Sequence, residues 1–514
     1  LKGGRRSVAR PAPPAASGFD GQRSRRTVPW QHCGPRGTLR GGMTRRCGDD
    51  APALSLAEIQ RLVRAASSAL RLEVDGDPGG KGRYLVACRP LRAGEAFLSE
   101  RPLFRGSTDG AQSQKVYLED FVALAAGPKD QAGDSSDEEG DPADDRLHPC
   151  SPLLDCVAGV LLERRRAFGG EDEAQRARAL LRLRQLAALC RAESEELVPE
   201  ACAADIFGVL RPEFQGLTSE DEVRDLVHAI SSNRFGGGLN QLDLMFTGSM
   251  FEHSCTPNCF VGSWRGAGQG TPAPQVVSFR ALRDVAEGEA LSIDYVQLPD
   301  AYLAAAGRAA VLGPWGFQCT CPRCTDLPEL TRAFLCAACG APELCPVSPR
   351  PGAELRCRAC GVPAEAAYAA RCLAAEARAG GGFAQAEPTA EPEAEPDDRS
   401  DVRLLGRHHH AVFEVVWAHV SLGPVGNPEG TSSYKGALEA LIQSVSRLYG
   451  DPCHPQLLDL YHAMAELHEG NLEGQRRWLD FERGVIKRCY PEEIEKQDQE
   501  ILAMVQGRPP FAPE

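Results

Sequence analysis

The sequence predicts an α+β multidomain protein, with small β-sheets in its first half and an all-helical part at its C-terminal end. Three observations support this fold class. Short apolar segments separated by Gly and Asp turns occur at 70–105 and again at 275–296, which is typical of short strands. Helical periodicity dominates 150–232 and 401–510. Cysteine pairs cluster between these regions, and 514 residues are enough for two to four domains.

Charge is distributed unevenly along the chain. Residues 1–48 contain eleven Lys and Arg and a single Asp, whereas the whole chain carries a formal net charge of −14. The body is therefore acidic, which makes nucleic acid an unlikely main ligand and suits a basic substrate. The arm at 1–48 is rich in Arg, Pro and Gly and is expected to be disordered. Organelle targeting is the alternative, but the arm lacks an amphipathic pattern.

Residues 54–126 are expected to form an N-terminal helix and the first half of the strand-rich domain. Ser55 followed by Glu58 is a capping-box signature, and the apolar residues after it repeat at helical spacing. The stretch `LEVDGDPGGKGRYLVACRPLRAGEAFLSERPLF` then predicts two strands joined around `GGKGRY`. A further strand is expected after the turn at Ala93-Gly94.

The second half of this domain is separated from the first by two inserted segments. Residues 127–149 are acidic, rich in Pro and Gly and nearly free of large apolar groups, so we expect a linker. The helical patterns of 150–232 predict a helical insertion. Strand signals return within 233–325, at `QVVSFRALRD` and `EALSIDYV`, on either side of the turn `AEGE`.

The C-terminal part is expected to be a helical domain at 401–510, after a linker at 380–400. Its amphipathic helices resemble tetratricopeptide-type stacking. They are expected at 402–420, 432–449, 455–469, 472–489 and 491–506. His408, His409 and His410 are consecutive, so on one helix they point in three directions, and we expect them to be solvated. The sequence has no run of about twenty apolar residues that would predict a membrane span.

The segment `GFQCTCPRC` places Cys319, Cys321 and Cys324 on one short loop. Three thiolates can occupy three corners of a tetrahedron around Zn²⁺, at about 2.3 Å each. A closed structural site needs a fourth ligand from elsewhere in the chain. Cys255 in `HSCTPNC` is the favoured donor because it stands at the head of a turn, with His253 or Cys259 as the alternatives.

A second set of cysteines predicts a zinc-ribbon-like module at 330–362. Cys336-x₂-Cys339 and Cys357-x₂-Cys360 match the spacing of two zinc knuckles, each followed by glycine. We therefore expect two structural zinc ions. Such spacings suit metal ligands better than disulfides, which indicates a reducing compartment, the cytoplasm and/or the nucleus.

Five segments occur in an order that resembles a SET domain: `GKGRYLVACRPLRAGEAFLSERPLF`, `SNRF`, `HSCTPNC`, `EGEALSIDY` and `GFQCTCPRC`. They are most similar to the SMYD branch of SET-type protein lysine methyltransferases. The resemblance implies a knotted set of small β-sheets, a rare topology. It also implies that the `HSC` segment lies beside the `SIDY` strand, and that Cys255 completes a post-SET zinc loop.

The chain departs from the SMYD branch in two places. The branch usually carries a MYND zinc finger after the `ERPLF`-like strand, and here the acidic linker stands in its place, so the finger is missing. The branch also usually has Asn before the His of the `HSC` motif, and this chain has Glu252. A carboxylate there would either face the amino group of the cofactor or weaken its binding.

The activity implied by the resemblance is methyl transfer from S-adenosylmethionine to a lysine ε-amine in a histone or non-histone protein. Tyr295 matches the active-site tyrosine, whose hydroxyl would orient the amine and contact the methyl group. Trp315 would line the lysine channel and hold a cationic amine by cation–π attraction. Phe317 would pack against the cofactor. Trp315 or Phe317 alone would more often belong to a core, whereas the position of Tyr295 in its motif favours the functional role over a Tyr that merely caps a strand.

The resemblance also implies a set of residues that bind the cofactor. The turn around Lys81, Gly82 and Arg83 would reach its methionine part. Asn233 would bind its amino-acid end and His253 its adenine, through the backbone. Glu252, Tyr295 and Phe317 complete the expected set.

A second hypothesis is a catalytically weak, SET-like zinc protein that binds partners through its helical domain, a chaperone among them. Glu252 is its best support in the sequence. A third treats the ribbon-like module and basic arm as a nucleic-acid module, which the acidic body opposes. The protein is expected to be a monomer.

Overall fold

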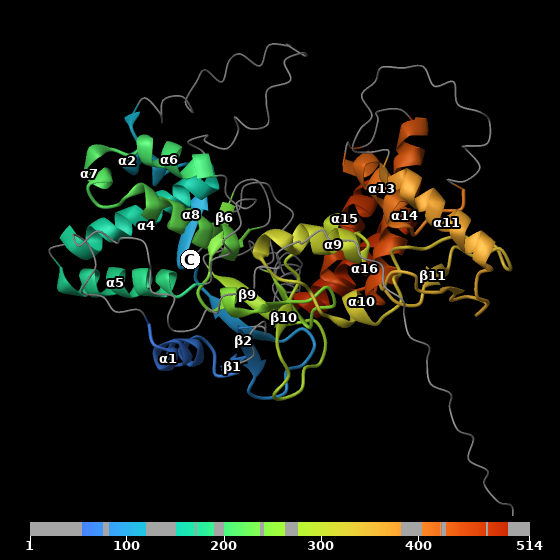
Figure 1. The fold of residues 1–514 in the computed structure, drawn as a ribbon, viewed down its shortest axis with the longest axis horizontal. Coiled ribbons are helices and arrows are strands. Elements are labelled where there is room, and N and C mark those ends of the chain that lie inside the picture. The colour runs from blue at the N-terminus through green and yellow to red at the C-terminus, as the bar shows by residue number, and fades with distance from the viewer. Residues whose placement is uncertain are drawn as a thin grey trace, which may run out of the picture.

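The computed structural model describes residues 54–75, 82–119, 151–169, 172–189, 200–236, 241–262, 276–381, 403–421, 423, 428–468 and 471–491. The basic arm, the acidic linker at 127–149, nearly all of the linker at 380–400 and nearly all of the expected helix 491–506 lie outside these residues. Figure 1 shows three regions: helices α2 and α4–α8 on one side, small sheets at the centre, and helices α11–α16 on the other side.

The first described elements are those that the sequence predicts. Helix α1, Leu56–Ala66, has its capping box in place, since the Ser55 hydroxyl accepts from the Glu58 amide and the Glu58 carboxylate accepts from the Ser55 amide. Strands β1, Leu70–Val74, and β2, Arg83–Ala87, then pair antiparallel across the `GGKGRY` connection. Strand β3, Ala96–Glu100, follows the Ala93-Gly94 turn.

All the sheets of the described residues have two or three strands. Strand β3 pairs with β9, Val277–Ala281, which pairs with β8, Cys259–Val261. A second three-stranded sheet joins β4, Phe104–Ser107, β6, Gln241–Leu244, and β5, Arg234–Phe235. Such small sheets bury little area alone, so they depend on the helices that cover them.

One short parallel pair positions the site. Strand β7, Glu252–His253, lies beside β10, Ser292–Ile293, with His253 opposite Ile293. The `HSC` segment therefore lies beside the `SIDY` strand, as the resemblance implies. Because parallel neighbours run in the same direction, the residues that leave both strands, Ser254 and Asp294, emerge at the same edge.

The helical insertion forms a layer over these sheets (Figure 1). Helix α2, Ser113–Val116, lies beside it and packs with α4. The insertion consists of α4, Pro152–Gly169; α5, Glu173–Ala187; α6, Glu200–Gly208; α7, Pro212–Gln215; and α8, Glu220–Asn233. Helix α4 is buried along most of its length, and its apolar side chains join the largest hydrophobic core, which also contains β1–β4. Its Asp155 carboxylate accepts three backbone N–H bonds from Ser107, Gln112 and Ser113, which anchors α2 and the end of β4.

The middle of the chain is loop-rich. One 3₁₀ turn, η2 at Gly248–Met250, comes just before β7. After β10 the chain forms a second 3₁₀ turn, η3 at Asp300–Tyr302, and then α9, Ala305–Leu312; η4, Gly313–Trp315; and α10, Pro322–Thr325. The expected ribbon-like module contains an antiparallel pair, β11, Leu344–Pro346, and β12, Leu355–Cys357. Helix α11, Ala366–Gly381, follows and packs on this module.

Four helices form the C-terminal region: α13, His410–Ser421; α14, Pro428–Tyr449; α15, Leu458–Glu466; and α16, Leu472–Cys489. The first starts eight residues later than predicted. Residues before it are in turns because Leu405 bridges to Phe334 and the Leu335 amide donates to the Leu404 carbonyl, so this segment pairs with the ribbon-like module instead. Pro455–Leu457 forms the 3₁₀ turn η5 before α15.

The C-terminal helices and the strand-rich domain share a hydrophobic core. Tyr302 stacks on Phe413 of α13, with ring centroids 3.9 Å apart, and Phe260 of β8 meets Tyr490 edge-on. None of the helices in the described residues combines the length and apolar character needed to cross a membrane. The cysteines in these residues are all free thiols.

A buried histidine makes this helical region sensitive to acid. His454 stacks on Tyr449 with ring centroids 3.6 Å apart, and its Nδ1 accepts from the Gln456 amide at the start of η5. Burial, aided by the charge of Arg488, lowers the pKa of His454 to about 3, from 6.5. Because the folded pKa lies below the unfolded one, the neutral ring stabilises the fold above pH 6.5, and this contribution is lost as the pH falls toward 3.

We therefore expect wild-type protein to lose about 2 kcal/mol more stability than His454→Asn between pH 7.5 and pH 5. Asn keeps a capping acceptor but does not titrate. Urea unfolding at both pH values measures this difference. Equal losses in the two proteins would show that His454 is already charged in the folded state or stays neutral in both states.

Candidate functional site

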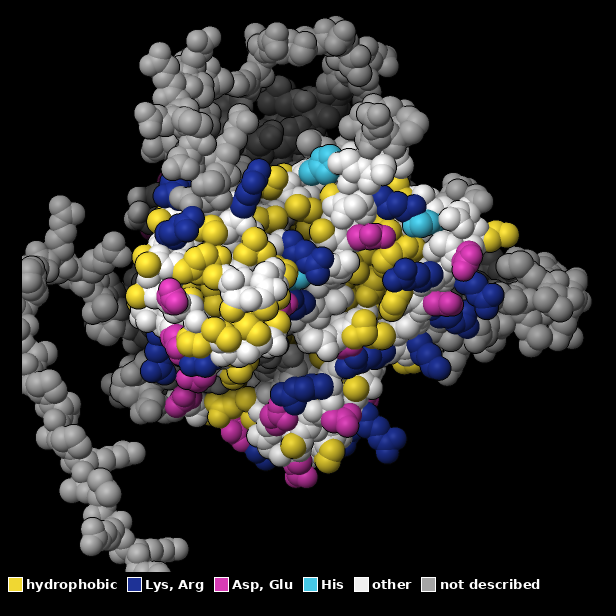
Figure 2. Space-filling view, turned by 90° about the vertical axis from the view of Figure 1, so that its right-hand side faces the viewer, with side chains coloured by type: hydrophobic (Ala, Val, Ile, Leu, Met, Phe, Trp, Pro, Cys, Tyr) yellow, Lys and Arg dark blue, Asp and Glu magenta, His cyan; other side chains and the backbone are white. Residues whose placement is uncertain are grey.

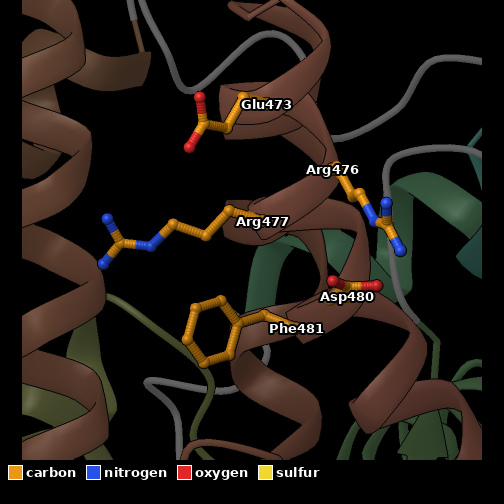
Figure 3. A pocket seen from close by; sticks show the side chains of 5 residues that line it. All are labelled: Glu473, Arg476, Arg477, Asp480 and Phe481. Carbon is orange, nitrogen blue, oxygen red and sulfur yellow. The ribbon is translucent and has the colours of Figure 1, made fainter.

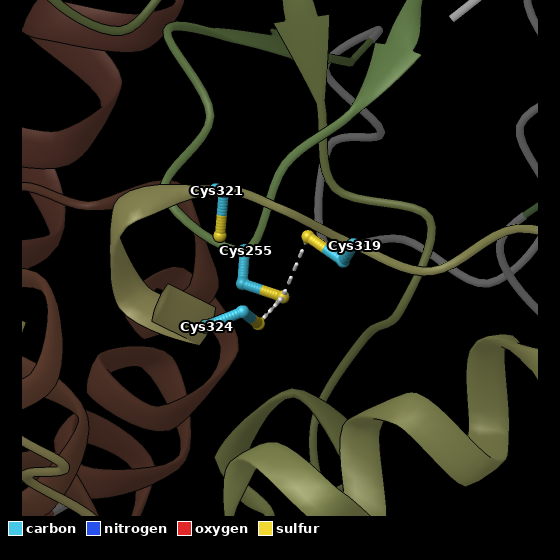
Figure 4. Close-up of side chains that lie close together, drawn as sticks. All are labelled: Cys255, Cys319, Cys321 and Cys324. Carbon is cyan, nitrogen blue, oxygen red and sulfur yellow. Dashed lines mark hydrogen bonds between the residues drawn. The ribbon is translucent and has the colours of Figure 1, made fainter. Parts of the chain in front are cut away.

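Four cysteine sulfurs meet beside the β7–β10 pair. Cys255 follows β7, whereas Cys319, Cys321 and Cys324 lie on the segment that forms α10 (Figure 4). The Sγ of Cys255 lies 3.9 Å from that of Cys319 and 3.6 Å from that of Cys324. Sulfurs bound to one Zn²⁺ at about 2.3 Å in a tetrahedron would be about 3.8 Å apart. The four thiols therefore fit a closed zinc site.

Of the three candidates for the fourth ligand, the structure brings Cys255 into this cluster. Cys259 is buried apart from it, with its thiol on the Asn258 side-chain oxygen. His253 touches the cluster from outside, with Nε2 at 3.3 Å from the Cys255 Sγ. Hydrogen bonds with Cys255 and then Cys319 lower the pKa of Cys324 to about 6, whereas hydrogen bonds with Cys319 and the other two cysteines raise the pKa of Cys255.

A buried arginine lies against this cluster. Arg308 of α9 has a 1% exposed side chain, and its Nη2 lies 3.5 Å from the Cys324 Sγ and 3.5 Å from a carboxylate oxygen of Glu329. It also donates to the Leu303 carbonyl. The guanidinium therefore supplies positive charge beside thiolates that would outnumber the charge of one Zn²⁺.

The second cysteine set also converges. The Sγ atoms of Cys336 and Cys360 are 3.7 Å apart, and so are those of Cys339 and Cys357. Each knuckle closes on a glycine with positive φ, Gly340 at +71° and Gly361 at +75°, a conformation that side chains disfavour. This is the geometry expected for a zinc-ribbon-like module, and Cys345 and Cys372 lie outside the four.

The expectation that His408, His409 and His410 are solvated is wrong. His409 is fully buried and His408 is 4% exposed. Packing against α11 and α14 covers them, since His408 bonds to Ser444 and the Nε2 atoms of His409 and His410 both lie 3.3 Å from one oxygen of Glu376.

This third cluster does not suit a metal ion. The Ala411 amide donates to Nδ1 of His409, so the neutral ring carries its proton on Nε2, the atom that faces Glu376. Both oxygens of Glu376 also accept from Arg332. The proton on His409 Nε2 and the Arg332 guanidinium stand where a cation would bind, so the cluster consists of Glu376 hydrogen-bonded to Arg332 and His410, with the His409 ring packed beside them.

We expect purified protein to contain two zinc ions per chain, measured by elemental analysis. Cys321→Ser and Cys339→Ser should each reduce the content by one, because each removes a ligand from a different closed site. Glu376→Gln should leave it at two. A content of three in wild type that falls to two in Glu376→Gln would contradict this reading of the histidine cluster.

Aromatic side chains gather around Tyr295, the residue after Asp294 at the end of the `SIDY` strand. Its ring centroid lies 5.2 Å from that of His253, 6.4 Å from that of Trp315 and 6.1 Å from that of Phe317. Trp315 and Phe317 reach it from the same loop because Gly316 between them adopts a positive φ of +75°. The three expected catalytic residues are therefore brought together, each half-buried.

Tyr295 is held at both ends. Its hydroxyl donates to the Phe251 carbonyl at 2.5 Å, and its amide donates to Nδ1 of His253 at 3.1 Å. Burial lowers the pKa of His253 to about 4, so its ring is neutral near pH 7. The side chain of His253 thus lies between the tyrosine and the cysteine cluster.

The residues expected to bind the cofactor lie on several elements. Lys81 is outside the described residues, and Gly82, with φ +71°, leads into β2. The Arg83 guanidinium donates to the Ala188 carbonyl just after α5, so it holds that helix end. Asn233 ends α8 and is 7% exposed, with its side-chain amide donating to the Ala229 carbonyl. Glu252 lies on β7, half-buried.

Sequence reasoning missed two polar side chains that fix this site. The Glu100 carboxylate accepts from the backbone amides of Phe246, Thr247 and Gly248, which orients the chain just before β7. Asn258 is 3% exposed, and its amide bonds to the Ser292 amide and the Ala290 carbonyl, which joins the `HSCTPN` turn to β10. An Asn that directly follows Pro in a turn-forming segment is the one signal that the sequence offered for Asn258.

Among the described residues, two hollows lie in the C-terminal helices. One, of about 480 Å³, lies along α16, where Arg477, Glu473 and Phe481 project to one side (Figure 3). The other, of about 520 Å³, is lined by Tyr461, Trp478 and residues of α14, together with Arg477 and Phe481. Figure 2 views the molecule from the side on which α11 and β11 lie in Figure 1, where Lys and Arg side chains are scattered among hydrophobic ones.

Comparison with known proteins adds a family match to this geometry. Residues 82–296 match the family model described as the SET domain. The match includes Tyr295, His253 and Cys255 and ends before the loop that carries Trp315.

No curated protein matches the chain. Solved structures similar to this chain include the SET domain of LSMT bound to lysine and AdoHcy and Rubisco LSMT bound to AdoMet, with TM-scores of 0.30 and 0.28. Each is 14% identical, over 88% of this chain and 94% of the other. At this identity and these TM-scores, the similarity does not indicate the roles of the site residues.

Proposed function

We propose that the chain transfers a methyl group from S-adenosylmethionine to the ε-amine of a lysine in a protein substrate, from the premise that residues 82–296 form a SET domain. The observation that carries the proposal is the grouping of Tyr295, Trp315 and Phe317 beside a cysteine cluster that fits zinc. The order of the five sequence segments supports the finer proposal, an enzyme of the SMYD branch without a MYND finger.

The chain's own residues have three tasks in this reaction. An exposed lysine has a pKa of about 10.4, so its amine is charged near pH 7 and cannot attack until it loses a proton. A site lined by half-buried aromatic rings disfavours the charged form. Trp315 would hold the incoming side chain, and the Tyr295 hydroxyl would orient the amine toward the methyl group.

The sulfonium cofactor supplies an activated methyl group when it is bound. In the transfer, the sulfur–carbon bond would break as the nitrogen–carbon bond forms, the sulfur would leave as a neutral thioether, and the one proton released is that which the lysine ammonium gives to water before the attack. Gly82, Asn233 and the β7 backbone at His253 would bind the cofactor, and Phe317 would pack on it. Two zinc ions would be structural, because each four-thiol set leaves no open position.

The proposal is tested with purified protein and labelled S-adenosylmethionine. We expect calorimetry to show binding of the cofactor, and labelled methyl to appear on lysine when core histones or fractionated cell protein are added. The acidic body favours basic substrates. Absence of cofactor binding in zinc-loaded, folded protein would contradict the proposal. We also propose a cytoplasmic and/or nuclear location, since two thiolate clusters require reduced cysteine.

The runner-up is a scaffold with a weak site that binds protein partners through the C-terminal helices. The hollows lined by Arg477, Trp478 and Phe481 favour it. Glu252 separates the two functions. If Glu252→Asn creates cofactor affinity that wild type lacks, the scaffold is supported, whereas an affinity already present in wild type supports the enzyme.

A further inference from the structure

The His253 ring connects the cysteine cluster to the active-site tyrosine. Its side chain is fully buried, with Nε2 at 3.3 Å from the Cys255 Sγ and Nδ1 at 3.1 Å from the Tyr295 amide nitrogen. Its ring also packs at 5.8 Å, centroid to centroid, from Phe317. One rigid side chain thus contacts a metal ligand and two of the three residues expected around the substrate.

The hydrogen bonds fix which nitrogen carries the proton. A backbone amide can only donate, so Nδ1 of His253 must accept from Tyr295. In the neutral ring the proton is then on Nε2, which donates to the sulfur of Cys255. The contact is therefore an N–H···S bond that would orient a metal-bound thiolate, in the way that outer groups orient metal ligands.

The backbone makes the connection short. His253 and Ile293 are opposite one another in the β7–β10 pair, and the Ser254 amide donates to the Ile293 carbonyl. Tyr295 follows two residues after Ile293, and its hydroxyl is bound to the Phe251 carbonyl, two residues before His253. A shift of Cys255 would therefore move the His253 ring and the tyrosine amide together.

We propose that His253 is a positioning residue that couples metal occupancy of the Cys255–Cys319–Cys321–Cys324 site to the placement of Tyr295. The catalytic consequence rests on the proposed function, but the coupling itself does not.

Two substitutions of His253 each remove one of its two hydrogen bonds and keep the other. His253→Asn keeps an acceptor near the position of Nδ1 and loses the donor to Cys255. His253→Gln places a donor near the position of Nε2 and loses the acceptor for Tyr295. The pair tests each half of the connection while leaving a polar side chain of related size.

The first readout is zinc release to a chromophoric chelator. We expect His253→Asn to release zinc from this site about 10–100-fold faster than wild type, the usual effect of losing an outer hydrogen bond to a metal ligand. His253→Gln should stay near the wild-type rate. The release phase of the ribbon-like module, identified by its loss in Cys339→Ser, should be unchanged and shows that the variants are folded.

The second readout is the ¹⁹F resonance of 3-fluorotyrosine at position 295, assigned by its loss in Tyr295→Phe. Chelation of zinc should move this resonance in wild type. In zinc-loaded His253→Gln it should already be displaced, and in His253→Asn it should no longer respond to chelation. Cys339→Ser should not alter it.

Wild-type zinc release in both variants would overturn the coupling, and so would a wild-type response of the resonance to chelation. Equal loss of zinc retention and of the native resonance in both variants would show that the ring only fills space, which also overturns it. Neither readout requires methyl transfer. Failure of the proposed function, seen as absent cofactor binding in wild type, is therefore distinguishable from failure of this proposal.

Discussion

Tyr295→Phe is expected to lower kcat for methyl transfer about 100-fold while changing the KM for S-adenosylmethionine less than about threefold. The hydroxyl is the only polar group that this ring offers to the substrate, and its bond to the Phe251 carbonyl fixes the ring's position. Loss of alignment of this kind costs about two orders of magnitude in rate. Steady-state kinetics with a lysine-containing protein substrate measure both constants.

Tyr117→Phe is the matched control. The Tyr117 hydroxyl also donates to a backbone carbonyl, that of Leu154, but it lies in the core beside the helical insertion. It should cost about 1 kcal/mol of stability and leave kcat unchanged. If Tyr295→Phe and Tyr117→Phe have equal kinetics, or if the former raises only KM, Tyr295 does not act in the transfer step.

The cysteine sites show what can be predicted from sequence and where prediction stops. Spacing alone groups Cys319, Cys321 and Cys324, and it groups the two pairs of the ribbon-like module, because such spacings are typical of zinc ligands. For the fourth ligand the sequence favoured Cys255 and left His253 and Cys259 as alternatives. Only the parallel pairing of β7 with β10 and the path of the following loop decide among them, and no local pattern encodes that pairing.

The prediction that His408, His409 and His410 are solvated was wrong for a related reason. The expectation of three diverging, solvated side chains assumed that all three lie on one helix, but α13 begins only at His410. Pairing of residues 404 and 405 with the ribbon-like module puts His408 and His409 in a buried turn. Local helical periodicity could not reveal this tertiary contact. The buried Arg308 was missed likewise, since its surroundings in the sequence, `AAAGRAAVL`, suggest only a small helix.

Arg308→Met is expected to destabilise the protein by about 3–5 kcal/mol. The guanidinium lies 3.5 Å from Glu329, and both side chains are 1% exposed. Glu329 also accepts from the Ala305 amide and the Thr331 hydroxyl, so it is fixed in place and would remain as an uncompensated buried charge. Urea unfolding of the zinc-loaded protein measures the loss.

Two further variants separate the buried charge from a simple loss of packing. Arg350→Met breaks an exposed pair with Asp326 in the same region and should cost less than about 1 kcal/mol. Arg308→Met combined with Glu329→Gln should recover part of the loss, because the remaining partner no longer carries a charge. If the double variant is as unstable as the sum of the single ones, Arg308 acts through its contact with Cys324, and its zinc release should then be faster as well.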